Sequence, residues 1–191
     1  MVSDFTKTII IDGDETEIPG ERYQTIQAAI ADSQHNELST NGGVIIVEQG
    51  TYTIDNSDPN HGTINVPSNV TIIGRGNAVI EVTSDVSAFK NADQTNGNDR
   101  ITISGFKIEV NYTAGVYTQH LIHMKNVNKS VIEKLTISVE SVWGVKKAQG
   151  ESTPRAILFE GEGTDTPTYC RDNVISQCFI KNFGNKYAKA S

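Results

Sequence analysis

The chain repeats one six-residue apolar pattern three times, as Ile103-Ser-Gly-Phe-Lys-Ile108, Ile132-Glu-Lys-Leu-Thr-Ile137 and Ile175-Ser-Gln-Cys-Phe-Ile180. A looser copy precedes them, with Val70–Ile73 followed by Val79–Val82. Each copy is typical of two short strands separated by a bend. Such a unit cannot cover its own apolar face, whereas stacked copies share a continuous core. The repeat therefore predicts a solenoid in which equivalent isoleucines lie over one another.

A second, evenly spaced set of segments precedes these copies. Its members are Phe89-Lys-Asn91, Met124-Lys-Asn126 and Phe159-Glu-Gly161, which begin 35 residues apart. Parallel stacking of these strands predicts that their first, apolar residues lie over one another in the core. The same alignment predicts a ladder of stacked amides from Asn91 to Asn126, which Gly161 would end.

The aliphatic composition of the 191 residues also indicates a β protein. The chain contains 22 Ile and 16 Val but only 4 Leu. Branched side chains pack well on pleated strands and lose rotamer freedom in helices. The composition therefore excludes a helix bundle, and the length fits one domain or a piece of a larger protein.

The sequence predicts one helix near the N-terminus. Thr8–Ile11 is expected to form a first strand, and Tyr23–Ala31 has helical spacing of its apolar residues. Thr25 is the expected N-cap of a helix over residues 25–34. We therefore divide the chain into residues 1–43, a strand and a capping helix, and residues 44–191, the stacked repeats of the front part of a longer coil.

Four segments carry a family resemblance: Tyr23-Gln-Thr-Ile-Gln-Ala-Ala-Ile30, Gly42–Val47, Gly50–Tyr52 and Asn69–Gly76. In this order and spacing they resemble the start of the pectate-lyase-like, right-handed parallel β-helix proteins. The resemblance implies an all-β solenoid whose N-terminal helix caps the open end of the coil. It leaves the activity open, because that superfamily includes lyases, hydrolases, epimerases, phage tailspikes and structural proteins.

Charge and patterning exclude several partners. The net charge is −7 and the basic residues are scattered, which argues against a nucleic-acid-binding face. No apolar run approaches the roughly 18 residues of a membrane span, so no membrane insertion is expected. Cys170 and Cys178 form neither a disulfide framework nor a metal-ligand pattern, and their oxidation state stays open.

Strand alternation places candidate site residues on one outer face. With Ile122 and Met124 pointing inward, His123 and Lys125 point outward, and Glu160 is expected one repeat above Lys125. These side chains form either an acid and a base on a sugar-binding face or a surface ion pair stacked along a sheet. Surface pairs are common in proteins, so the sequence favours the second interpretation.

The long loop between Arg155 and Asp172 gives weaker candidates. Glu160, Asp165 and Arg155 are the residues we expect to carry catalysis if the protein cleaves its ligand, while Arg171 would bind a sugar carboxylate in bidentate fashion. Carboxylates spaced by glycines can also hold Ca²⁺. The same sequence is ordinary turn chemistry, so no metal site is assigned.

Loop aromatic residues offer a further means of binding sugars. Trp143 and Tyr169 fall between the predicted strands, where flat rings can stack on a saccharide or fold back over the coil. We expect a polysaccharide-binding module of an extracellular, cell-surface or virion-borne protein that acts, if it cleaves, as a lyase or hydrolase. The alternative is a non-catalytic structural β-helix of a tailspike, appendage or surface fibre.

The C-terminal end of the predicted coil also needs a partner. The last strand is followed by no convincing cap, and an uncovered edge strand pairs with other chains. We therefore expect either continuation of the coil beyond residue 191 or coverage by a partner chain in a homo-oligomer.

Overall fold

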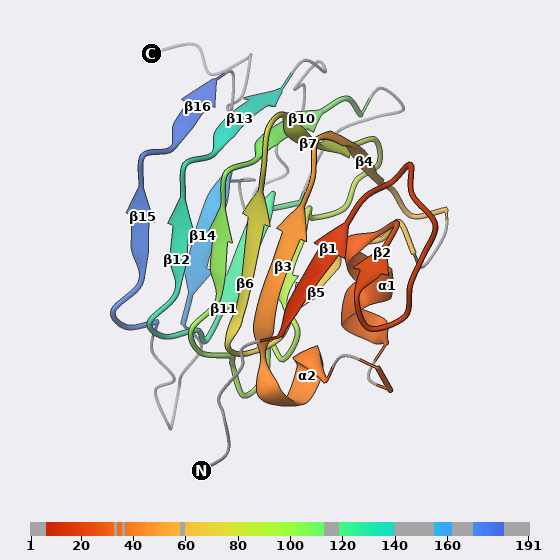
Figure 1. The fold of residues 1–191 in the computed structure, drawn as a ribbon. Coiled ribbons are helices and arrows are strands. Elements are labelled where there is room, and N and C mark those ends of the chain that lie inside the picture. Colours follow the sequence, from red (N-terminus) through yellow and green to blue (C-terminus); the bar gives the residue numbers. More distant parts are fainter. Residues whose placement is uncertain are drawn as a thin grey trace, which may run out of the picture.

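A computed structural model describes residues 7–32, 34–35, 37–57, 60–112, 119–139, 155–161 and 170–181. Within these residues the chain forms three β-sheets and two short helices (Figure 1). Every pairing between the strands named below is parallel, in agreement with the predicted all-β class.

We name the sheets A, B and C. Sheet A has the strand order β15 (Val174–Ser176), β12 (Val131–Glu133), β9 (Thr102–Ser104), β6 (Val70–Gly74), β3 (Gly43–Val47), β1 (Thr8–Ile11), β2 (Arg22–Tyr23). Sheet B has the order β16 (Phe179–Lys181), β13 (Thr136–Val139), β10 (Lys107–Val110), β7 (Ala78–Val82), β4 (Gly50–Ile54). Sheet C has the order β14 (Ile157–Glu160), β11 (Ile122–Lys125), β8 (Phe89–Asn91), β5 (Ile64–Val66).

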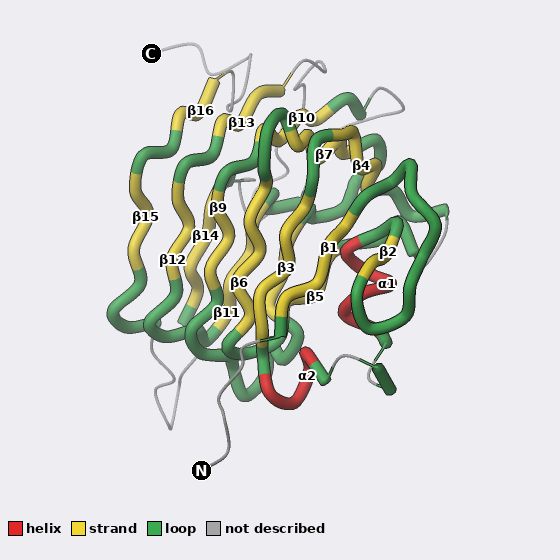
Figure 2. The backbone as a smooth tube through the Cα atoms, in the orientation of Figure 1, coloured by secondary structure: helices red, strands yellow, loops and turns green. Residues whose placement is uncertain are grey.

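From β3 onward the chain visits the sheets in the fixed order A, B, C, so each strand pairs with the strand three places later (Figure 2). The predicted repeat register is confirmed in two sheets. In sheet A, Ile132 pairs with Ile103 on one side and with Ile175 on the other. In sheet B, Ile137 likewise pairs with Ile108 and Ile180.

The inward side chains of all three sheets form one apolar core. Alternate residues of the strands are buried, as in β3, where Gly43, Ile45 and Val47 are buried and the residues between them are partly exposed. The rings of Phe89 and Phe106 lie 5.9 Å apart between their centroids and are tilted by 49°. This continuous core is what the apolar repeat predicts.

A residue with left-handed backbone conformation lies in the turn before several of the sheet A strands. One such residue precedes the strand in each of four repeats, with φ between 54° and 63°: Asn69, Arg100, Lys129 and Asp172. A polar column runs beside them, in which the Asn128 amide donates to Asp99 Oδ1 at 3.2 Å and the Arg171 N–H donates to Asn128 Oδ1 at 2.9 Å. These residues lie at the corner where the chain passes from sheet C to sheet A, and their hydrogen bonds link successive repeats.

The predicted register between β8 and β11 is wrong by two residues. Phe89 pairs with Ile122 and not with Met124. A slip of two residues keeps every side chain on the same face, so the alternation of apolar residues cannot distinguish the two registers. The expected amide ladder is also wrong, because the Asn91 amide accepts from the N–H and donates to the C=O of Lys125.

The next register along the chain is confirmed. Met124 pairs with Phe159, and Lys125 pairs with Glu160, one repeat above it. Met124 is fully buried, whereas Phe159 packs against the core and is only partly buried. The Asn126 amide donates to the backbone C=O groups of residues 94 and 95, and so takes no part in a ladder of amides.

Two helices lie near the N-terminal strands, where one was predicted. Helix α1 (Ile26–Ala31) is capped by Thr25, whose hydroxyl accepts the N–H of Ala28 at 3.1 Å. The helix is shorter than predicted, because Asp32 forms its C-cap. It packs beside β2 and β5 with Ile26 and Ala29 buried (Figure 1). Helix α2 (Leu38–Asn41) was missed because its four residues include a single apolar side chain.

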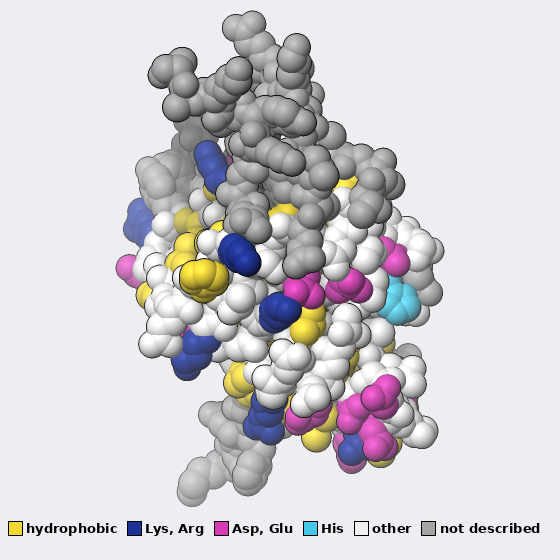
Figure 3. All heavy atoms as spheres, turned by 90° about the horizontal axis from the view of Figure 1, so that it is seen from above, with side chains coloured by type: hydrophobic (Ala, Val, Ile, Leu, Met, Phe, Trp, Pro, Cys, Tyr) yellow, Lys and Arg dark blue, Asp and Glu magenta, His cyan; other side chains and the backbone are white. Residues whose placement is uncertain are grey.

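The outermost strands of sheets A and B expose apolar side chains. Val174, Ile175, Phe179 and Ile180 are each between 46% and 62% exposed. Figure 3 shows the side of the molecule that carries sheet B, where basic, acidic and hydrophobic side chains are interspersed. Whether the last strands meet further protein stays a prediction.

Candidate functional site

The outer face of sheet C gathers most of the described candidate site residues. Because Ile122 and Met124 are buried, the intervening His123 and Lys125 point outward, as predicted. In-register pairing places Lys90 one repeat below His123. Neighbouring strands lie about 4.8 Å apart, so outward side chains of successive repeats are close enough to act on one ligand.

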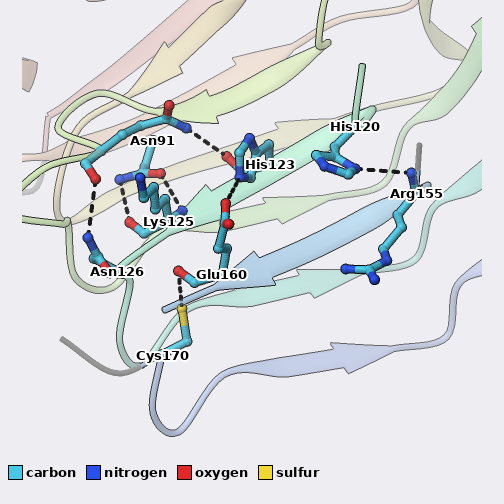
Figure 4. Close-up of polar contacts among 9 residues, drawn as sticks. Asn91, His120, His123, Lys125, Asn126, Arg155, Glu160 and Cys170 are labelled. Atoms are coloured by element: carbon cyan, nitrogen blue, oxygen red, sulfur yellow. Dashed lines mark hydrogen bonds and ion pairs between the residues drawn. The ribbon is translucent and has the colours of Figure 1, made fainter. Parts of the chain in front are cut away.

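His123 and Glu160 are in direct contact across β11 and β14. His123 Nε2 lies 2.7 Å from Glu160 Oε2, and the two side chains are 17% and 47% exposed (Figure 4). The sequence predicted an ion pair here between Lys125 and Glu160, whereas the contact in the structure involves the imidazole. His123 is two residues before Lys125, the register partner of Glu160, and a diagonal neighbour on the adjacent strand is close enough for long side chains to meet.

A second histidine lies beside this pair. The rings of His120 and His123 meet edge to face with their centroids 5.1 Å apart. His120 Nδ1 lies 3.1 Å from the backbone nitrogen of Arg155 and accepts its N–H (Figure 4). In the neutral ring the proton is therefore on Nε2. Burial, followed by the positive charges of His123 and Arg155, lowers the pKa of His120.

Backbone contacts hold the strands that carry these side chains. The Glu160 carbonyl accepts the N–H of Asn126 at 2.8 Å and the thiol of Cys170 at 3.2 Å. The His123 carbonyl accepts from the Gln94 amide at 3.4 Å. These bonds fix the backbone at both members of the His123–Glu160 pair, which makes the pair a defined feature of the surface.

The structure brings together four of the predicted residues and separates one from them. Glu160, Arg155, His123 and Lys125 share the outer face of sheet C or its margin. Arg171 lies at the corner between sheets C and A, where its N–H bonds Asn128 and its backbone forms a bridge to the same residue. Asp165, Trp143 and Tyr169 lie outside the described residues, so their roles stay predictions.

Sequence reasoning missed His120. The residue precedes β11 and has no place in the alternation of the strand. The spacing His120-Leu-Ile-His123 is the signal that could have found it, because two histidines three residues apart at the start of a strand can approach each other.

The side chains on the outer face of sheet C include both donors and acceptors of hydrogen bonds. Imidazole, ammonium and guanidinium groups donate, and the carboxylate accepts. Among the described residues no group of three or more His, Cys, Asp or Glu side chains is arranged to hold a metal ion. Neither described helix is long and apolar enough to cross a membrane.

Comparisons with protein families, with curated proteins and with solved structures found no match to this chain. No relative therefore supplies a function or a set of site residues. The inferences below rest on the geometry of the described residues and on the sequence.

Proposed function

We propose that the chain is a polysaccharide-binding module built on a right-handed parallel β-helix of the pectate-lyase-like kind. Two observations support this fold: the strands are parallel within each of three sheets, and the chain passes from sheet A to B to C in a fixed order. The position of α1 beside β2 and β5 agrees with the cap that the sequence resemblance implies. We place the protein outside the cell, on a cell surface or on a virion.

The contact between His123 and Glu160 carries the proposal for the binding face. A saccharide presents many hydroxyl groups, each of which can donate and accept a hydrogen bond. Glu160 on β14 supplies a partly exposed acceptor, while His123 and Lys125 supply donors on the neighbouring strand β11. A hydrogen bond that involves a charged group contributes about 1.5–3 kcal/mol, so two or three of them orient a bound sugar.

Cleavage is the second part of the proposal. An imidazole and a carboxylate in contact can move a proton between them and to a bound substrate. β-Elimination needs a base at the proton beside a uronate carboxyl group, whereas hydrolysis needs an acid at the leaving oxygen. We propose that His123 and Glu160 serve these roles if the protein cleaves its ligand, with Arg155 positioned at the margin of the face.

A binding and cleavage screen tests the proposal. The chain is tested against neutral and acidic plant, algal and bacterial polysaccharides, alongside the Glu160→Gln, His123→Asn and Glu109→Gln variants. Glu109 is a matched control, because it forms an ion pair with Lys107 on the outer face of sheet B. We expect the control to bind as the wild type does and the two site variants to lose about tenfold in affinity, the equivalent of one charged hydrogen bond.

The products and the negative outcomes are equally informative. Unsaturated products that absorb in the ultraviolet would assign a lyase, and new reducing ends alone would assign a hydrolase. The proposal would be contradicted if the chain bound none of the polysaccharides in the panel. Equal affinity of the wild type and both site variants would exclude sheet C as the binding face.

A structural role is the alternative, and two observations favour it. The hydrogen bonds of Asn128 with Asp99 and Arg171 join successive repeats, and the single apolar core runs through all of them. Contacts of this kind between repeats would stabilise an elongated structural element. In that case the His123–Glu160 contact is only a surface ion pair between neighbouring strands. The same screen separates the two functions, because a structural element would retain no polysaccharide.

A further inference from the structure

The last described repeat, formed by β14, β15 and β16, exposes the side chains that point into the core. Ile175 is 50% exposed and Ile180 is 46% exposed. Their partners in the preceding repeat, Ile132 and Ile137, occupy the same inward positions and are fully buried. An inward residue is therefore buried where a further repeat lies over it. We call the surface at β14, β15 and β16 the open end, because it presents the cross-section of the apolar core.

The same two isoleucines direct backbone groups toward the free edges of their sheets. The N–H groups of Val174 and Phe179 donate to backbone carbonyl groups next to β12 and β13. Successive residues of a strand point their N–H and C=O groups toward opposite edges, so those of Ile175 and Ile180 point away from the sheet. An edge strand that presents such groups is a template for pairing with another chain.

The two ends of the stacked repeats are different (Figure 1). At the N-terminal end, α1 packs beside β2 and β5, which are the first strands of sheets A and C. At the open end, β14, β15 and β16 are the outermost strands of all three sheets. Pairing in all three sheets at once therefore requires a second open end. Two like ends related by a two-fold axis form a closed dimer, whereas head-to-tail contacts would form a filament.

A two-fold axis that is perpendicular to sheet A and passes through β15 satisfies the three edges together. It sets β15 antiparallel to β15 of the second copy and exchanges the other two sheets, so that β16 meets β14 of the second copy. Placing Ile175 opposite its own copy and Ile180 opposite the second copy's Phe159 keeps every inward side chain inward. Residues 155–161 and 170–181 carry three basic and two acidic side chains, so two such ends meet without strong repulsion.

We propose that two copies of this chain associate through their open ends in a closed two-fold dimer whose sheets run through both copies. Antiparallel pairing gives partners to the backbone groups of Ile175 and Ile180 and buries their side chains. Sheet C of one copy is then continued by sheet B of the other, so the two sheet C faces lie on different sides of the dimer. The inference does not depend on the ligand that the protein binds.

Sedimentation equilibrium of the 191-residue chain tests the assembly. We expect a reversible, concentration-dependent association that stops at twice the monomer mass, with dimer present by about 100 μM. A monomer at every concentration up to that value would overturn the inference. Continued growth to species larger than a dimer would overturn the closed two-fold pairing, because it indicates head-to-tail contacts.

A pair of matched variants tests the place. Ile180→Lys puts a charge among the inward side chains of the open end and is expected to weaken dimerisation at least about tenfold. Ile18 is 45% exposed and forms a bridge with Arg22 near the N-terminal end, so Ile18→Lys is the control and should dimerise as the wild type does. Circular dichroism checks that both variants are folded. Equal dimerisation of Ile180→Lys and the wild type would overturn the assignment to the open end.

Amide hydrogen exchange of the unaltered chain locates the interface without any substitution. The N–H groups of Ile175 and Ile180 are expected to exchange at least about tenfold faster when dilution dissociates the dimer. The N–H groups of Val174 and Phe179 are bonded within each copy and should keep their rates. Rates for Ile175 and Ile180 that do not change with concentration would overturn the pairing of these edges.

Discussion

The side chain of Asn91 takes the place of a strand backbone opposite Lys125. Its Oδ1 accepts the Lys125 N–H at 2.8 Å, and its Nδ2 donates to the Lys125 carbonyl at 2.9 Å. Asn91 is 1% exposed, so these bonds are shielded from water. The contact fixes the end of β11, from which Lys125 extends over the outer face of sheet C.

We therefore expect Asn91→Ala to lower the free energy of unfolding by about 2–3 kcal/mol. The substitution removes the partner that Asn91 gives to the partly buried N–H and C=O of Lys125, and the loss of a partner by such a group costs about 1–3 kcal/mol. Asn65→Ala on β5 is the control, because Asn65 is exposed. Chemical denaturation measures both, and a loss below about 0.5 kcal/mol for Asn91→Ala would contradict the role given to this amide.

Three phenylalanines differ in burial and so should differ in their contribution to stability. Phe89 is fully buried, Phe159 is partly buried against the core, and Phe179 is 62% exposed. Phe89→Ala is expected to cost about 3–5 kcal/mol, as in other well-packed cores. Phe159→Ala should cost less and Phe179→Ala about 0.5 kcal/mol or less. Denaturation midpoints that do not follow this order would contradict the assigned burial.

The sequence predicted the repeat because its apolar pattern is long and recurs. Ile103, Ile132 and Ile175 stand in register as their aligned segments require. The pairing of Phe89 with Ile122 could not be predicted in the same way. A two-residue slip preserves the inward and outward faces, and the amide contacts of Asn91 that accompany the observed register are not visible in a pattern of apolar residues.

The part of the candidate site that lies on the repeated strands could be predicted, because the repeat determines which strand positions face each other. Lys125 and Glu160 occupy aligned strand positions, and their pairing follows from the repeat. His120 and Arg155 precede their strands, so the pleat does not determine where their side chains lie. The hydrogen bond between them depends on the path of two chain segments 35 residues apart, which the local sequence does not encode.

Gly105 is expected to tolerate no side chain. Its φ is +81°, and an added Cβ would lie 2.5 Å from the carbonyl oxygen of Gly74 in the preceding repeat. A non-glycine residue in the left-handed region costs about 1–2 kcal/mol before the clash is counted. Gly105→Ala should therefore lower the stability by at least about 2 kcal/mol.

Gly13→Ala is the matched control for Gly105→Ala. The nearest atom to a Cβ on Gly13 is 4.0 Å away, so the added methyl group has room. Thermal unfolding should show a clear decrease in Tm for Gly105→Ala and little change for Gly13→Ala. Equal Tm values for the two variants would show that successive repeats do not approach closely at Gly105.

Acid should destabilise the region around α1 through Asp32. The hydroxyl of Tyr23 donates to Asp32 Oδ2 at 2.8 Å, and His35 Nδ1 lies 2.8 Å from Oδ1. The bond from Tyr23, followed by that from His35, lowers the pKa of Asp32 below 3.8. Because the folded state favours the ionised carboxylate, its contribution to stability is complete above the unfolded pKa and is lost as pH falls through the folded value.

Asp32→Asn should therefore make the free energy of unfolding less dependent on pH below about pH 4. The dependence should not vanish, because hydrogen bonds also lower the pKa of Asp55 and Asp93. Asp12→Asn, a substitution of the same kind near β1, is the control and should follow the wild-type curve more closely. Denaturation curves between about pH 2 and about pH 6 measure the difference, and superimposable curves for the wild type and Asp32→Asn would contradict the contribution of Asp32.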